Sequence, residues 1–158
     1  MSIWVAIFLF LHVMGAIIAF GPGYSAPIIG RLAGQEPQHA NFAARINAAI
    51  TDQRVVPLAI FQGITGLALI WLGSFNPFTQ LWLGLGIVLY LLAVGYSLFI
   101  QRPTIQRIVA LSSAPPPPGA TGPSHELVAA ITRARQGGTI LGVLVLVIVI
   151  LMVTKPTI

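Results

Sequence analysis

His12 is the residue of this chain with the clearest capacity for chemistry, because it lies inside a long apolar run that holds no other ionisable side chain. The run covers residues 3–20. At about 1.5 Å per residue it spans roughly 27 Å, which is close to the thickness of the hydrocarbon core of a bilayer. An ionisable group at that depth is costly and is treated by default as a functional site.

Three interpretations of His12 are open. A neutral imidazole can bond to a neighbouring helix through Gln62, Thr65, a tyrosine or a backbone carbonyl; it can be an axial haem ligand; or it can hold a metal or relay protons. His39 and His125 lie in charged stretches, so no second imidazole reaches the same depth. One nitrogen ligand is not a metal site. We therefore predict no metal, favour the bonded histidine and keep haem b as the alternative cofactor.

Motifs for catalysis are missing from the sequence. The chain has no cysteine, no glycine-rich phosphate loop, no paired carboxylates within an apolar segment and no nucleophile motif. The densest polar cluster, residues 52–54, adjoins an apolar segment and is typical of side chains that reach from the membrane interface into water. We predict no catalytic residues and interpret the protein as non-enzymatic.

The composition predicts an integral membrane protein, since 56% of the 158 residues are hydrophobic and only 7% are charged, against about 25% charged in soluble domains. Four apolar segments have the length of membrane-spanning helices. The predicted fold class is all-α, a four-helix membrane bundle forming one domain over residues 1–158. The four spans are predicted at about residues 3–20, 55–72, 81–100 and 137–154.

The distribution of positive charge predicts the orientation. Connections 31–54 and 101–137 together hold seven arginines, whereas only Lys155 lies on the other side of the predicted membrane. Positive connections stay in the cytoplasm, so both termini are expected outside a bacterial inner membrane. The first run is too long, and lacks the preceding positive charge, for a cleaved signal peptide. The arginines form no dense run, and no nucleic-acid partner is expected.

The helices are expected to continue into the charged connections. Helical periodicity predicts helix over residues 41–50 and 104–111. A proline-rich linker is predicted over residues 112–123, followed by Ser124 as the N-cap of the last helix. Pro57 is expected to kink the second helix.

Two pairs of polar residues are expected at the surface, and one break is expected in the first helix. His39 is predicted to pair with Glu36 or Asp52, and His125 with Glu126. Glycine and proline at residues 21–23 are expected to interrupt the first helix near its charged end.

Small residues indicate where the helices touch, because helices in lipid associate through close packing. The polar side chains expected in the interior are Gln62, Thr65 and Tyr90. We expect the first three helices to enclose that interior and the fourth to pack only through its charged end. The packing residues predicted on the first two helices are Gly15, Ala19, Gly23, Gly63 and Gly66.

Short segments of the chain resemble a known family. Residues 10–16 (FLHVMGA), 21–23 (GPG) and 151–156 (LMVTKP) are similar to the bacterial predicted integral membrane proteins called domain of unknown function 2269. That resemblance implies four transmembrane helices and no established activity. The Leu-His pair followed by small residues is also similar to copper-resistance membrane proteins and to small membrane haem-dependent protoporphyrinogen oxidases, which implies a cofactor or metal role for His12 alone.

The function predicted from these observations is that of an accessory or scaffold subunit of a membrane complex. Its expected partners are the lipid bilayer and either other proteins or further copies of itself. Two alternatives stay open: a haem-binding or redox membrane protein with His12 as axial ligand, and a small transporter.

Overall fold

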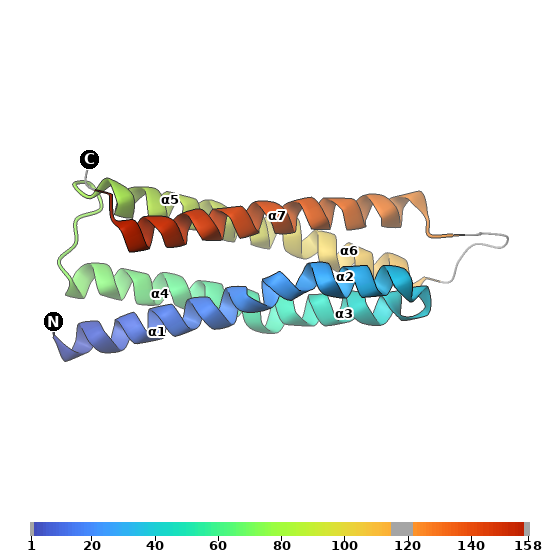
Figure 1. Cartoon of the computed structure of the whole chain (residues 1–158), viewed down its shortest axis with the longest axis horizontal. Coiled ribbons are helices and arrows are strands. Elements are labelled where there is room, and N and C mark those ends of the chain that lie inside the picture. Colours follow the sequence, from blue (N-terminus) through green and yellow to red (C-terminus); the bar gives the residue numbers. More distant parts are fainter. Residues whose placement is uncertain (1, 115–121, 157–158) are drawn as a thin grey trace.

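The computed structural model of the protein describes residues 2–114 and 122–156, and every regular element within them is a helix. The helices line up end to end into four long rods (Figure 1). In chain order the elements are α1 (Ile3–Phe20), η1 (Gly21–Ser25), α2 (Ala26–Gln35), η2 (Pro37–His39), α3 (Ala40–Ile50), η3 (Thr51–Val55), α4 (Val56–Leu72), α5 (Leu81–Tyr96), η4 (Ser97–Gln101), α6 (Arg102–Ser113) and α7 (His125–Thr154).

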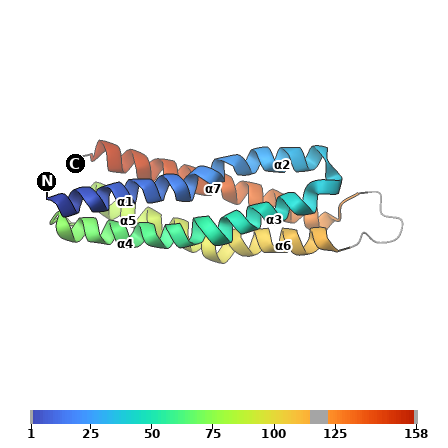
Figure 2. The same ribbon diagram turned by 90° about the horizontal axis from the view of Figure 1, so that it is seen from below.

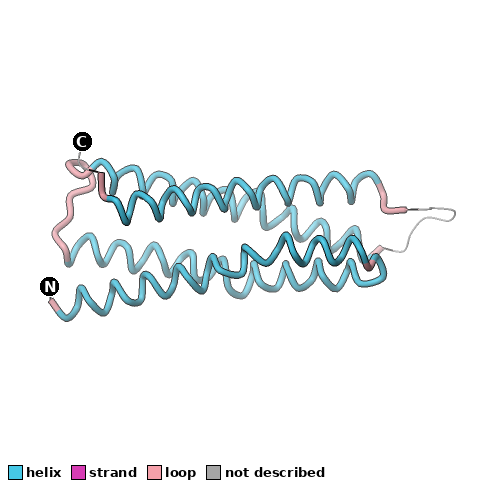
Figure 3. Tube along the Cα trace, viewed as in Figure 1, coloured by secondary structure: helices cyan, strands magenta, loops and turns pink. Residues whose placement is uncertain are grey.

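Each of the four rods contains an apolar stretch long enough to cross a membrane, so the predicted all-helical class with four spans is confirmed. We call α1, α4, α5 and residues 137–154 the apolar half, and α2, α3, α6 and residues 125–136 the charged half. The apolar half lies at the end of the molecule that carries both termini, as Figure 1 shows. Within the described residues, loops appear only at the two ends of the rods (Figure 3).

The helices of the charged half run further than predicted. Residues 26–35 form α2, where the sequence indicated only a connection, and Pro27 in its first turn suits a helix start. Ser112 and Ser113, assigned to the linker, are the last residues of α6. Both hydroxyls donate to the Val109 carbonyl, which extends the helix end. The linker residues 115–121 lie outside the described residues.

In two of the rods the α-helix widens into one turn of π-helix shortly before a proline. In η3 and η4 the backbone forms π-helix, with Val56 N–H donating to the Thr51 carbonyl and Arg102 N–H to the Ser97 carbonyl. Pro57 and Pro103 lack the N–H that would close the next α-helical bonds. The wider turn is one of the known ways for a helix to absorb that loss. The expected irregularity at Pro57 therefore takes the form of a π-turn.

The first helix is interrupted where the sequence indicated, because α1 ends at Phe20 and η1 follows with Pro22 in its first turn. The Ser124 hydroxyl accepts from Leu127 N–H, which confirms the predicted N-cap of α7.

The apolar half consists of two helix pairs, α1 with α4 and α5 with α7. Figures 1 and 2 show each pair running side by side. In the charged half α3 packs on α6 and α6 on α7, while α2 packs on α3. The expectation that the fourth span packs only through its charged end is therefore wrong. Near the C-terminal end of α7, the Met152 methyl fills the space beside Gly86, where a side chain would collide with it. Methionine is a flexible side chain that fills such gaps readily.

Candidate functional site

The interface between α1 and α4 holds most of the buried residues of the apolar half. Gly15 and Ala19 are buried on α1, and Ala59, Gln62 and Thr65 are buried on α4. Small residues let the two backbones approach closely. Gly23, expected on the same face, is exposed with open space around it, because it belongs to η1 beyond the end of α1.

His12 is half-buried at this interface and is bonded to Thr65, with Nδ1 and Oγ1 2.9 Å apart. The Thr65 hydroxyl has one proton, and it donates to the Phe61 carbonyl at 3.0 Å. In the tautomer that carries its proton on Nδ1, His12 donates to this hydroxyl oxygen, and Nε2 then carries the lone pair. The ring lies against Gly66, where an added Cβ would come within 3.2 Å of His12 Cε1.

Gln62 is the second polar residue of the interface and is 8% exposed. Its Oε1 is buried and has no hydrogen-bond partner among the described residues. That oxygen faces Gly15, where an added Cβ would lie 2.9 Å away. A glycine here leaves room for the amide and presents Cα–H groups, which are weak donors.

The same arrangement recurs between the second pair of rods. Gln101 is 9% exposed, its Nε2 donates to the Ala134 carbonyl at 2.9 Å, and its Oε1 has no partner among the described residues. That Oε1 lies against Gly137 of α7. Sequence reasoning missed this pair, although a lone glutamine at the end of an apolar run was a usable signal.

Tyr90 joins the two helix pairs. Its hydroxyl on α5 donates to the Ala59 carbonyl on α4 at 2.7 Å. The phenol lies against Gly63, so any side chain there would collide with it. Of the polar residues predicted in the interior, Gln62 and Thr65 lie on α4, and Tyr90 of α5 contacts α4. His12 contacts α4 from α1.

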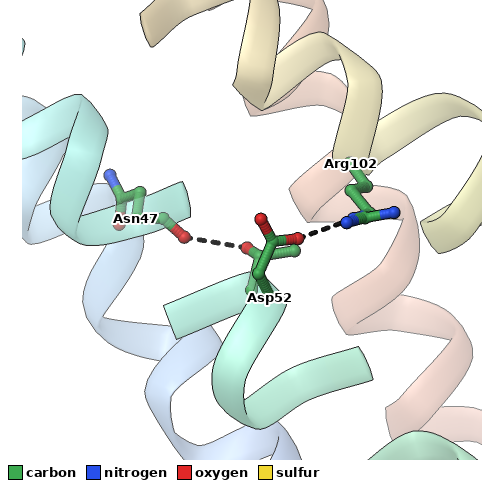
Figure 4. Close-up of polar contacts among 4 residues, drawn as sticks. Asn47, Asp52 and Arg102 are labelled. Atoms are coloured by element: carbon green, nitrogen blue, oxygen red, sulfur yellow. Dashed lines mark hydrogen bonds and ion pairs between the residues drawn. The ribbon is translucent and has the colours of Figure 1, made fainter. Parts of the chain in front are cut away.

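At the level of the π-turns an ion pair connects two rods. Arg102 Nε donates to Asp52 Oδ1 at 2.6 Å, as Figure 4 shows. One residue before Asp52, the Thr51 hydroxyl donates to the Asn47 carbonyl. Asp52 therefore pairs with Arg102 rather than with His39.

The two remaining surface acids pair within the charged half. His39 lies 3.8 Å from Glu36, one of its two expected partners. Glu126 pairs with Arg107 rather than with His125.

His12 is the ionisable side chain of this site with the clearest capacity to bind a ligand. Over the part of the chain that the structure describes, no group of three or more His, Cys, Asp or Glu side chains could hold a metal ion. A shallow apolar groove of about 400 Å³ starts one helical turn from His12 and runs toward the outer ends of α1 and α4. It is lined by Trp4, Phe8, Ala68, Trp71 and Leu72.

Four rods, each with an apolar stretch long enough to cross a membrane, define a polytopic integral membrane protein. The chain belongs to the family described as predicted integral membrane protein, domain of unknown function 2269, whose model matches residues 6–156. No curated protein and no solved structure matches the chain.

Proposed function

We propose that this protein is an accessory or scaffold subunit of a membrane assembly, built as a four-helix bundle in the bacterial inner membrane with both termini outside. The observation that carries the proposal is the use of polar side chains between the helices, two of them in the apolar half and one in η4. His12, Tyr90 and Gln101 each bond to another helix of the same chain. They serve to hold helices together, and no complete constellation for catalysis accompanies them.

Glycines that this chain does not use for its own packing support a role in assembly. Among the residues that the structure describes, nothing lies within 4 Å of an added Cβ at Gly95 on α5 or at Gly142 on α7. Close helix contacts in membranes form at such small residues. The α5–α7 pair therefore has room for the helix of another subunit or of a second copy.

The proposal is tested by in-membrane crosslinking and native electrophoresis of a Gly95→Leu/Gly142→Leu variant. We expect the wild-type protein to migrate in an assembly larger than one chain, and the variant to lose that species while its level in the membrane is kept. Val143→Leu, an equally apolar change at an exposed neighbouring position, is the control. A wild-type protein that runs as a lone monomer and turns over a substrate would contradict the proposal.

A second candidate function, haem binding, is favoured by the hydrogen bond between His12 and Thr65. In the tautomer that donates from Nδ1 to Thr65, Nε2 carries the lone pair, and orienting bonds of this kind are usual for ligating histidines. The apolar groove one turn away offers an aromatic wall. A single imidazole fits one axial position, so a second ligand would come from another copy or the sixth position would stay open.

Visible spectra of the detergent-purified protein, oxidised and reduced with dithionite, distinguish the two candidates. Under the accessory proposal, protein from haem-replete cells gives no Soret band. A Soret band that disappears in His12→Ala and is kept in Tyr90→Phe would favour the haem candidate instead.

A further inference from the structure

Acidic side chains are scarce in this protein, and each of them already has an ion-pair partner. Only three acidic residues occur in the chain. Five exposed arginines have no ion-pair partner among the described residues. The engaged pairs are Glu36 with His39, Asp52 with Arg102 and Glu126 with Arg107, and the remaining arginines are Arg31, Arg45, Arg54, Arg133 and Arg135.

The two edge helices of the charged half leave apolar side chains uncovered. On α2, Ile28 is 63% and Leu32 is 53% exposed; on the first third of α7, Val128 is 46% and Ile131 is 40% exposed. Residues three or four apart share one face of a helix. Each edge helix therefore carries an apolar stripe outside the apolar half.

An unpaired arginine accompanies each stripe. Arg31 follows Ile28 by three residues, and Arg135 follows Ile131 by four, so each lies on the same face as its stripe. Such a face is complementary to an amphipathic helix with aliphatic and acidic side chains. The aliphatic side chains of the helix would pack on the stripe, and its carboxylates would pair with the arginine.

We propose that the stripe of α2 (Ile28, Arg31 and Leu32) and the stripe of α7 (Val128, Ile131 and Arg135) together form one edge surface, and that this edge surface binds an acidic amphipathic helix of a partner protein. This inference rests on the proposed accessory function and names the chemistry of its partner. The partner helix would bury its apolar face on the stripes and place carboxylates beside Arg31 and Arg135.

Geometry and charge disfavour two other occupants. Leu32 lies 12 residues beyond the end of α1, or roughly 18 Å along the rod. Figures 1 and 2 show α2 directed away from the apolar half, so a flat membrane would reach only the near end of the stripe. A second copy would bring the same arginines against this surface, and like charges facing each other are unfavourable.

The test uses the full-length protein in nanodiscs of zwitterionic lipid and a fluorescein-labelled 20-residue helical peptide, with leucines on one face and glutamates on both sides of them. Fluorescence anisotropy measures binding. The same peptide with lysine in place of glutamate is the charge control. Ile28→Gln/Leu32→Gln and Arg31→Glu/Arg135→Glu alter the surface, whereas Phe42→Gln and Arg45→Glu are equivalent changes at exposed positions outside it.

We expect the glutamate peptide to bind more tightly than the lysine peptide, and each surface variant to bind it at least about tenfold more weakly. Equal binding of both peptides, or equal losses in the two controls, would overturn the inference. So would flotation of the loaded nanodiscs with phosphatidylglycerol vesicles that is abolished by the same variants, because the surface would then bind a membrane. These outcomes leave the crosslinking result for the proposed function unaffected.

Discussion

Single residues at the interfaces follow one pattern, in which a polar side chain lies against a glycine of the facing helix. Gln62 lies against Gly15, and Gln101 against Gly137. Each amide has a buried oxygen without a partner among the described residues, a cost that is lower where backbone Cα–H groups can approach. The glycines therefore serve the polar groups as well as the close approach of helices.

Replacing Thr65 by valine keeps the shape of the side chain and removes the bond to His12. We expect the free energy of unfolding in a bilayer-mimicking detergent to fall by about 0.5–1.5 kcal/mol, the usual range for interhelical hydrogen bonds in membranes. Thr65→Ser keeps the hydroxyl and should retain most of the stability. Equal losses in the two variants, measured by thermal denaturation, would show that the methyl group matters and the bond does not.

An alanine at Gly137 would collide with Gln101, whose amide would have to give up its bond to Ala134. We expect Gly137→Ala to lower the melting temperature by several degrees. Gly138→Ala, on the adjacent open face, should be tolerated. In a Gln101→Ala background the cost of Gly137→Ala should shrink, and a cost that stays the same would contradict this account.

At the scale of elements, the two π-turns fix the rotation of one half-rod relative to the other. Pro57 and Pro103 each follow the end of a π-turn by two residues, and the two turns bring Asp52 and Arg102 together. If Pro57 is replaced by alanine, the N–H returns and the turn can relax to α-helix. A one-residue change of winding rotates a side chain by about 100°.

We therefore expect Pro57→Ala to separate position 52 from position 102. The chain has no cysteine, so an Asp52→Cys/Arg102→Cys protein can be treated with a short thiol crosslinker without interference. Crosslinking should be efficient with Pro57 present and should drop severalfold with alanine there. An unchanged yield would mean that the π-turn is held by its surroundings and not by the proline.

The four spans could be predicted from sequence because lipid imposes a simple rule on apolar length. His12 and Thr65 were both identified, since a polar group within an apolar run needs a partner. The pairing of Gln101 with Gly137 could not be predicted, because it depends on which helices are neighbours in space. Helix α2 was missed because its glycines and proline weaken the local helical signal.

At the scale of the whole molecule, the described residues form two helical hairpins, residues 3–72 and residues 81–113 with 125–154, whose internal packing in the apolar half is largely separate. Contacts between the hairpins lie mainly in the charged half, where Asn41 donates to Ser112 at 3.0 Å and Asp52 pairs with Arg102. In the apolar half, Tyr90 provides a hydrogen bond between them.

Two fragments, residues 1–76 and 77–158, should therefore reassemble when they are co-expressed. We expect co-purification of the tagged first fragment with the second, and a clear reduction in yield with Tyr90→Phe. Tyr24→Phe, at an exposed position, is the control. Fragments that fail to associate would show that the covalent loop over residues 73–80 is required to hold the hairpins together.

The length of the rods has a consequence for any assembly that includes this protein. The rod Pro37–Leu72 has 36 residues, or about 54 Å, whereas a bilayer core is roughly 30 Å thick. Because the helical elements of this rod follow one another without an intervening loop, we expect the excess to form a projection of roughly 20 Å beyond the hydrocarbon. A partner bound to that projection would be held at a fixed distance from the membrane. The number of helical turns beyond the bilayer would set that distance, so the protein would act as a spacer.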